Sequence, residues 1–356
     1  MKSELRVALL GVGMMGAFHA EALSTRVRGA SVVVVSDYDP ARAAAVADRV
    51  GARVETDPIA AIHADDVDAV LIASPGAAHE EQVLACLDRG IPALCEKPLT
   101  TDVESARAIV AKERALGRPL IQIGFMRRFD AEYEALEKVI RNGDLGRPLL
   151  LHCTHRNPSV PDFFDSEYMI RDAVVHEADI TRFLLAEEIT SVSVIRGAAT
   201  AAAPVGTNDP MMVIFETESG CIVTDEIYVR TAVAYEVRTE VVGERGSAMI
   251  GLDTNMITKT TDGRWGGRLT PGFVERFGSA YDTELHRWVD AAKRGTIDGP
   301  GTWDGYAAVA VCEAGVEALR TGQKVAVRLG AADRSDFSTD EPVAGLTVPD
   351  LIGGRP

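Results

Sequence analysis

Short apolar runs alternate with helical stretches over the first 125 residues of the chain. The runs that predict strands are Leu5–Leu10, Ser31–Ser36, Val67–Ala73, Ala93–Cys95 and Leu120–Ile123. Between them, Ala- and Glu-rich segments such as His79–Arg89 and Asp102–Leu116 have helical periodicity. Strands that are apolar throughout and separated by helices are typical of a parallel sheet covered on both faces. We therefore predict an α/β domain with a doubly wound parallel sheet over residues 1–125.

The pattern changes after about residue 145, where strands follow one another with few helices between them. The expected strands are Leu149–Thr154, Ser191–Ile195, Met211–Glu216, Ile222–Tyr228, Tyr235–Val242 and Ala248–Ile250. The expected helices are Tyr133–Arg141, Arg171–Leu185, Glu284–Arg294 and Tyr306–Arg320. Neighbouring strands without intervening helices favour a mostly antiparallel sheet. We predict a second, C-terminal α/β domain over residues 126–330 for substrate binding and oligomerisation, followed by a flexible tail over 331–356.

Charge and cysteine content narrow the class of protein. With 37 basic and 53 acidic residues, the formal charge is −16, which would repel nucleic acid over most of the surface. The chain has no apolar run long enough to cross a bilayer and no secretory signal, so we expect no membrane partner. The five cysteines are scattered, which favours no disulfide framework and a reducing, cytoplasmic setting. The seven histidines form no tight ligand pattern, so we expect no metal.

A glycine-rich segment lies where the first strand is expected to meet a helix. It reads Gly11-Val12-Gly13-Met14-Met15-Gly16, the pattern G-x-G-x-x-G. In dinucleotide-binding folds the first glycine permits a tight turn, the second lets the pyrophosphate approach the backbone, and the third lets the helix pack on the strand. Glycine clusters also form ordinary turns, so the flanking elements carry the interpretation.

An acidic residue follows the second predicted strand. Asp37 comes 21 residues after Gly16, close to the place of the carboxylate that binds the adenosine ribose in such folds. A carboxylate there repels a 2′-phosphate and favours NAD over NADP. Arg42 could neutralise that phosphate, but we expect it to begin a helix that points away. The alternative is that Asp37 is a solvated turn residue.

Three residues later in the chain could perform acid–base chemistry. Lys97 should project from the carboxyl edge of the sheet, where it could stabilise a developing alkoxide; the alternative is a surface ion pair. Asp172 and His176 are four residues apart and should share one helical face. Histidine transfers protons near neutrality, and the carboxylate could orient it or pass the proton on. On spacing alone, an ordinary helix-surface pair is the simpler interpretation.

Taken in order, these motifs resemble the Gfo/Idh/MocA oxidoreductase family. The shared segments are Gly11–Gly16, Glu96–Pro98, Phe125–Asp130, His155–Pro158 and Asp172–His176, and the similarity runs from residue 5 to about 330. The last two segments are most similar to the inositol 2-dehydrogenase group of that family. One departure is Phe129, where a tyrosine is common in the family.

The resemblance implies a Rossmann domain followed by an α/β domain with an open, mostly antiparallel sheet, commonly assembled as a homotetramer. It implies Lys97, Asp172 and His176 as the catalytic set. The implied NAD contacts are Gly11, Gly13, Met14, Met15, Gly16, Asp37, Ser74 and Glu96. The residues implied to face the substrate are His155, Asn157, Tyr235 and Arg127.

The implied activity is the NAD-dependent oxidation of a cyclic polyol, myo-inositol, to 2-keto-myo-inositol in inositol catabolism. His176 would take the hydroxyl proton, with Asp172 as its partner, and Lys97 would hold the oxygen. Two alternatives remain open. The first is a dehydrogenase for another inositol isomer or a pyranose. The second is a non-catalytic NAD-binding sensor, against which the presence of a full proton-transfer set argues.

Overall fold

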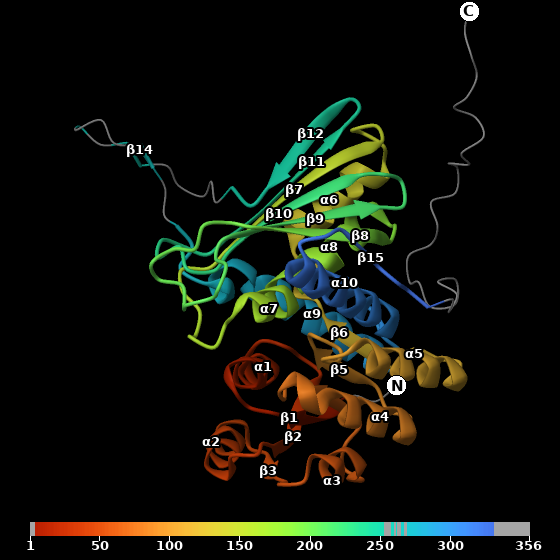
Figure 1. Cartoon of the computed structure of the whole chain (residues 1–356). Helices are drawn as coiled ribbons and strands as arrows, with labels where there is room; N and C mark the ends of the chain where they lie inside the picture. The colour runs from red at the N-terminus through yellow and green to blue at the C-terminus, as the bar shows by residue number, and fades with distance from the viewer. Residues whose placement is uncertain (1–3, 253–257, 260, 262–264, 267–268, 331–356) are drawn as a thin grey trace, which may run out of the picture.

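The structure is a computed structural model that describes residues 4–252, 258–259, 261, 265–266 and 269–330 (Figure 1). The expected flexible tail, residues 331–356, lies outside the described residues. Two large sheets dominate, one below and one above in Figure 1, with helices between and around them.

The N-terminal sheet has six parallel strands in the order β3-β2-β1-β4-β5-β6. Its strands are β1 (Leu5–Leu10), β2 (Ala30–Ser36), β3 (Arg53–Val54), β4 (Ala69–Ile72), β5 (Ala93–Glu96) and β6 (Ile121–Gly124). Its helices are α1 (Met14–Thr25), α2 (Pro40–Val50), α3 (Pro58–His63), η1 (Gly76–Ala78), α4 (His79–Arg89) and α5 (Val103–Leu116). Strands β4, β5 and β6 are buried along their whole length, as expected for a sheet covered on both faces. The predicted doubly wound parallel sheet is confirmed.

Helix starts in this domain differ in a way that matters for ligand binding. The side chains of Asp39, Asp57 and Asp102 accept hydrogen bonds from the first backbone N–H groups of α2, α3 and α5. Helix α1 instead follows Gly13, which has no side chain to cap it. Its N-terminal N–H groups are therefore free to bind an anion such as a phosphate.

The second sheet has seven strands in the order β12-β11-β7-β10-β9-β8-β15. Its strands are β7 (Pro148–Arg156), β8 (Ile189–Arg196), β9 (Met211–Thr217), β10 (Ile222–Tyr228), β11 (Glu236–Gly243), β12 (Gly246–Ile250) and β15 (Val325–Ala326); a separate pair is β13 (Thr258–Lys259) with β14 (Trp265–Gly266). Only β7 and β10 pair in parallel among the described strands of this sheet, so the expectation of a mostly antiparallel sheet is confirmed.

The remaining helices of this part are η2 (Met126–Phe129), α6 (Ala131–Arg141), α7 (Ser166–Met169), η3 (Ile170–Val174) and α8 (Val175–Leu185). The single helix expected over Arg171–Leu185 is longer in the structure. It begins at Ser166, so its start was predicted wrongly, and its middle stretch η3 is a π-helical turn. A π-turn adds a residue to the repeat, so side chains before and after it no longer follow the usual i, i+4 spacing.

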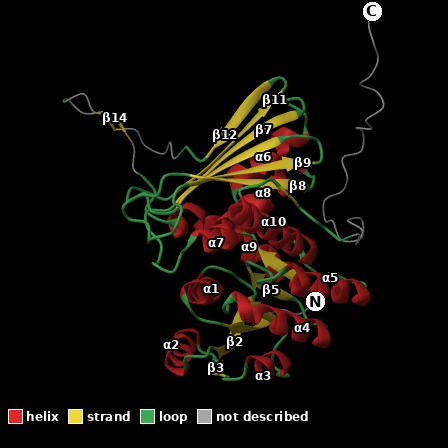
Figure 2. Cartoon of the chain, viewed as in Figure 1, coloured by secondary structure: helices red, strands yellow, loops and turns green. Residues whose placement is uncertain are grey.

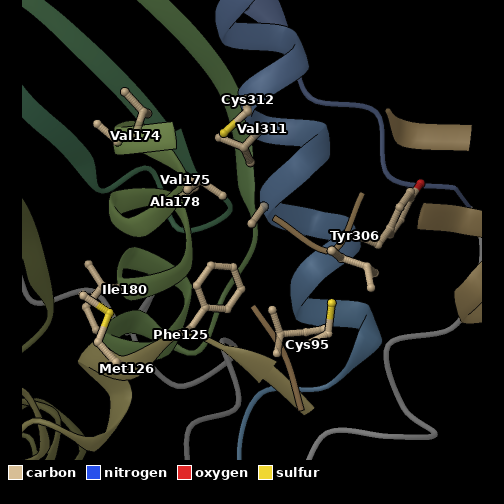
Figure 3. Close-up of a cluster of buried hydrophobic side chains, with 14 of the residues drawn as sticks. Cys95, Phe125, Met126, Val174, Val175, Ala178, Ile180, Tyr306, Val311 and Cys312 are labelled. Carbon is tan, nitrogen blue, oxygen red and sulfur yellow. The ribbon is translucent and has the colours of Figure 1, made fainter. Parts of the chain in front are cut away.

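Two long C-terminal helices, α9 (Phe273–Ala292) and α10 (Thr302–Thr321), bind the two sheets together (Figure 2). Leu285, Trp288 and Val289 of α9 belong to the same buried cluster as residues of β1, β2 and α1. Helix α10 packs against α5, β6 and β8. Figure 3 shows the resulting core, in which Cys95 of β5 and Phe125 lie in one cluster with Val175 of α8 and Val311 of α10. This cluster contains side chains from both parts of the fold, so β5 and α8 are held in fixed positions relative to each other.

Candidate active site

The glycine segment forms the tight loop between β1 and α1. Gly11 has a positive φ of 79°, and a Cβ there would lie 2.5 Å from the backbone of Ser74. A Cβ on Gly16 would lie 1.9 Å from the carbonyl oxygen of Gly11. At Gly13 the same position is open space. Gly11 and Gly16 are thus required by close packing, whereas Gly13 leaves room at the start of α1 for a phosphate to approach the backbone.

Asp37 lies at the end of β2, and its carboxylate faces this loop. Its Oδ2 accepts a hydrogen bond of 2.7 Å from the Val12 N–H, and its Oδ1 accepts one of 2.8 Å from the Asp39 N–H. Burial tends to raise the pKa of Asp37, but these N–H groups and Arg42 outweigh it and lower that pKa. Asp37 is therefore an ionised group fixed against the glycine loop, not a solvated turn residue.

The expectation that Arg42 points away is wrong. Its guanidinium donates to Asp37 Oδ1 at 2.9 Å and lies over the ring of Tyr38, 4.8 Å from the centroid. Arg42 is in the first turn of α2, where its side chain reaches back past the capping residue to the end of β2. The arginine therefore belongs to the ribose end of the candidate cofactor site.

The other expected cofactor residues line the same edge of the sheet. Met14 is exposed at the loop, Met15 is half-buried, and Ser74 follows β4. The Ser74 hydroxyl donates to Gln82 at 2.7 Å. Glu96 ends β5 and accepts a hydrogen bond of 2.6 Å from His19 of α1. These residues follow the carboxyl ends of neighbouring strands, where ligands of doubly wound sheets bind.

Lys97 extends from the end of β5 toward η3. Its Nζ donates to Asp172 Oδ1 at 2.7 Å and to the Asp172 carbonyl oxygen at 3.1 Å. Burial favours the neutral amine, but the Asp172 carboxylate and Glu96 outweigh it, and the pKa of Lys97 is raised. Lys97 is thus a half-buried, charged hydrogen-bond donor. The expected Asp172–His176 pair is not what the structure shows: the π-turn directs the Asp172 carboxylate to Lys97.

His176 is buried near the start of α8 and carries no charge at neutral pH. Burial, together with the cationic side chains of Arg127 and Lys97, lowers its pKa well below the usual range. Its ring lies 6.2 Å from the ring of His155, centroid to centroid. A neutral imidazole in this position can accept a proton.

His155 lies on β7 with its ring near that of His176, and two other side chains orient it. Its Nδ1 lies 3.3 Å from a carboxylate oxygen of Glu177 and 3.3 Å from an Arg127 nitrogen. Glu177 and Arg127 form a buried ion pair. Burial alone would raise the pKa of Glu177, but Arg127 and His155 lower it to about 2. Glu177 and Arg127 thus both contact Nδ1, which orients the His155 ring and leaves Nε2 as the nitrogen available to a ligand.

Asn157 and Tyr235 lie beside His155 in the candidate active site, whereas Arg127 lies behind His155. The Oδ1 of Asn157 is buried without a hydrogen-bond partner among the described residues, so a ligand hydroxyl could satisfy it. The Tyr235 ring lies 6.0 Å from that of His155, and burial raises its pKa to about 12, so it remains a hydroxyl donor. Arg127 is only 2% exposed and is held by Glu177, which places it behind His155 rather than at the ligand surface.

Sequence reasoning missed Glu177 and His19. Both are polar residues fully enclosed by packed helices, with exposures of 1% and 0%. The available signal was a charged or imidazole side chain on an otherwise apolar helical face. Such a residue needs a buried partner, and the partner comes from a distant part of the chain.

Over the described residues, no group of three or more His, Cys, Asp or Glu side chains is arranged to hold a metal. The five cysteines are buried and unpaired. Within the same part of the chain, every helix is too short or too polar to span a bilayer.

The fold and this set of groups define an NAD-dependent dehydrogenase acting on a CH–OH group. The chain belongs to the Gfo/Idh/MocA oxidoreductase family: the NAD-binding Rossmann model of the family matches residues 5–125, and its C-terminal alpha/beta domain model matches residues 137–327.

Among individual relatives, inositol 2-dehydrogenase of Rhodococcus erythropolis is 60% identical over 93% of this chain and 97% of its own. Inositol 2-dehydrogenase 2 of Mycolicibacterium vanbaalenii is 56% identical over 96% of this chain and 99% of its own. The crystal structure of myo-inositol dehydrogenase from Lactobacillus casei, in complex with NAD(H) and myo-inositol, matches with a TM-score of 0.90 and 31% identity, covering 94% of this chain and 100% of that one.

Proposed function

We propose that this protein oxidises myo-inositol at a secondary alcohol to 2-keto-myo-inositol with NAD as the hydride acceptor. The observation that carries the proposal is the convergence of a charged Lys97, a neutral His176 and an oriented His155 at the nicotinamide edge of a Rossmann sheet. The relatives named inositol 2-dehydrogenase support the choice of substrate.

The residues present fit the cofactor. Open space at Gly13, an uncapped start of α1 and the ionised Asp37 suit the pyrophosphate and the adenosine ribose. When bound at this edge, NAD supplies the acceptor for the hydride that leaves the substrate carbon.

Lys97 and His176 divide the proton chemistry. His176 takes the hydroxyl proton as the C–H electron pair departs, and the carbon–oxygen bond becomes a carbonyl. Lys97 donates a hydrogen bond to the same oxygen and stabilises the negative charge that develops on it. Asp172 acts through Lys97, because its carboxylate keeps the half-buried amine protonated.

Recognition of a polyol needs neutral hydrogen-bonding groups at several points of a ring. Asn157, Tyr235 and the Nε2 of His155 provide these groups, and the buried Arg127 behind them is neutralised by Glu177. An alcohol that lacks the matching hydroxyl would leave a buried donor or acceptor unpaired, which costs binding energy and gives selectivity.

Absorbance at 340 nm, with NAD and a panel of myo-inositol, scyllo-inositol and glucose, tests the proposal, with the product identified by NMR. We expect myo-inositol to have the highest kcat/KM. A tenfold preference for another member of the panel, about 1.4 kcal/mol, would mean that the substrate is wrong. NAD binding without turnover of any of them would favour the sensor alternative.

We further propose a cytoplasmic homotetramer that serves inositol catabolism. The five unpaired cysteines agree with a reducing compartment. Ile222 and Met249 are exposed on one face of the seven-stranded sheet, and we propose that a second copy covers this face. Light scattering after size-exclusion chromatography measures the assembly, and a monomeric mass would contradict it.

A further inference from the structure

His19 and Glu96 form a polar contact beneath the candidate site, and His19 has no part in the chemistry described so far. His19 of α1 is fully buried, and its Nε2 lies 2.6 Å from Glu96 Oε1. The second oxygen of Glu96 accepts the backbone N–H of Lys97 at 3.3 Å. Tyr281 of α9 packs edge-on against the His19 ring at 5.9 Å. One carboxylate thus connects the cofactor-binding helix to the segment that carries Lys97.

The geometry fixes which ring nitrogen of His19 carries the hydrogen. Its Nδ1 is buried without a hydrogen-bond partner among the described residues. An N–H at Nδ1 would be left unpaired next to the aromatic rings of Phe18 and Tyr281, which is costly. The hydrogen therefore lies on Nε2, and His19 donates to Glu96.

Glu96 lies at the nicotinamide half of the cofactor site. The glycine loop follows β1 and Asp37 follows β2, so the adenosine half lies over those two strands. Strands β4 and β5 lie on the other side of β1, and Glu96 ends β5. Gly124 of β6 makes room for this carboxylate, because a Cβ there would lie 3.1 Å from Glu96 Oε2.

We propose that His19 is a positioning residue for the dehydrogenation: by donating to Glu96 it holds that carboxylate beside Lys97, where its negative charge favours the oxidised, cationic nicotinamide over the reduced ring. The inference rests on the proposed function only in placing the nicotinamide next to Lys97. Without the hydrogen bond from His19, the Glu96 carboxylate would lose its one side-chain donor among the described residues and turn away from this position.

Glu284 of α9 supplies an internal control. It is fully buried, and neither of its carboxyl oxygens has a partner among the described residues. Burial, together with the nearby Glu96 and Asp179, raises the pKa of Glu284 well above its usual range. Glu284 is therefore neutral, and Glu96 is the carboxylate that His19 contacts.

Calorimetric binding of NAD+, NADH and ADP-ribose to the full chain tests the inference without any polyol. His19→Phe keeps the ring packing but removes the donor, whereas His19→Gln keeps a donor of similar reach. We expect His19→Phe to weaken NAD+ binding roughly fivefold more than NADH binding, and to leave ADP-ribose, which lacks nicotinamide, within about twofold. His19→Gln should restore most of the NAD+ affinity, and Glu284→Gln should change none of the three beyond about twofold.

Equal weakening of all three ligands by His19→Phe would overturn the proposal, because it would mean that His19 only supports α1. An unchanged NAD+ to NADH ratio would also overturn it, as would a Glu284→Gln variant that behaves like His19→Phe. Retained ADP-ribose binding shows that the variant is folded. The substrate panel does not enter these measurements, so a wrong polyol and a wrong role for His19 give different results.

Discussion

Lys97 and Asp172, which come from the two different parts of the fold, form a half-buried ion pair with 2.7 Å between Nζ and Oδ1. Lys97 follows β5 of the cofactor-binding sheet, and Asp172 lies in the π-turn that precedes α8. Removing the carboxylate from this half-buried pair leaves the Lys97 ammonium without its nearest counter-charge. The protonation of Lys97 therefore depends on the docking of the two parts against each other.

The first prediction concerns Asp172→Asn. Without the Asp172 carboxylate, the effect of burial on the Lys97 amine would be offset less, and the pKa of Lys97 would fall. Because Lys97 must be protonated to stabilise the alkoxide, kcat is lost as pH rises through this pKa. We expect the high-pH limb of the kcat profile to move down by at least about one pH unit, with a lower kcat at pH 9.

Arg171→Lys is the matched control, since Arg171 lies in the same π-turn but pairs with Glu313 at the surface. Its profile should coincide with that of the wild type. A high-pH limb that stays in place in Asp172→Asn would mean that Asp172 does not set the charge of Lys97.

The second prediction concerns His176→Ala. General acid–base groups contribute about 10²–10⁴-fold, and we expect a loss of kcat in that range with nearly normal NAD affinity. The pKa of His176 is lowered, so the wild-type base stays neutral as pH falls through 6.5, and kcat/KM should begin to fall only well below that pH. Stopped-flow rates of NADH formation from pH 5 to 8 measure both effects.

His152→Gln serves as the comparison, because His152 is an exposed residue of β7 that bonds Thr224. A loss of less than about tenfold in His176→Ala would remove His176 from the role of base.

Secondary structure could be predicted from the sequence where it depends on residues that are close together in the chain. Apolar strands such as Leu5–Leu10 and the glycine loop follow from burial and backbone constraints that act over a few residues. Strand β3 was missed because Arg53 and Val54 are both exposed and leave no apolar signal. The Lys97–Asp172 pair was missed because it joins positions 75 residues apart through a π-turn, which helical spacing does not reveal.

The third prediction concerns stability. Asp225 of β10 is fully buried with both oxygens unpaired among the described residues, and burial and Glu177 raise its pKa well above the usual range. The folded protein keeps this proton after the unfolded chain has lost it near pH 4. Stability therefore falls as pH rises above about 4, by up to about 1.4 kcal/mol per pH unit from this site.

Asp225→Asn removes that titration. The difference in Tm between variant and wild type should become more positive as pH rises from 4.5 to 8, whatever its value at pH 4.5. Calorimetric scans across this range measure it. A difference that stays constant with pH would show that Asp225 titrates alike in the folded and unfolded states.

The fourth prediction concerns the choice between NAD and NADP. Asp37 would meet the 2′-phosphate of NADP as an ionised group, because hydrogen bonds from Val12 and Arg42 keep its pKa low. Like charges in a partly desolvated site cost several kcal/mol, so we expect the wild type to prefer NAD by at least about a hundredfold in kcat/KM. Asp37→Ser should lower kcat/KM for NAD, because it loses the ribose acceptor, and raise it for NADP.

The ion pair between Asp37 and Arg42 also affects what replacing Asp37 does to NADP binding. Once Asp37 is replaced, the Arg42 guanidinium, now 2.9 Å from Oδ1 of Asp37, is released at the place of the 2′-phosphate. Most of the gain for NADP should therefore depend on Arg42, and the double variant Asp37→Ser with Arg42→Ala should lose it, whereas Arg42→Ala alone should keep the NAD preference. Initial rates with both cofactors for the four proteins give the coupling between the two residues. Additive effects of the two substitutions would mean that Arg42 serves only to hold Asp37. Comparable use of NAD and NADP by the wild type would mean that Asp37 is not the source of the preference.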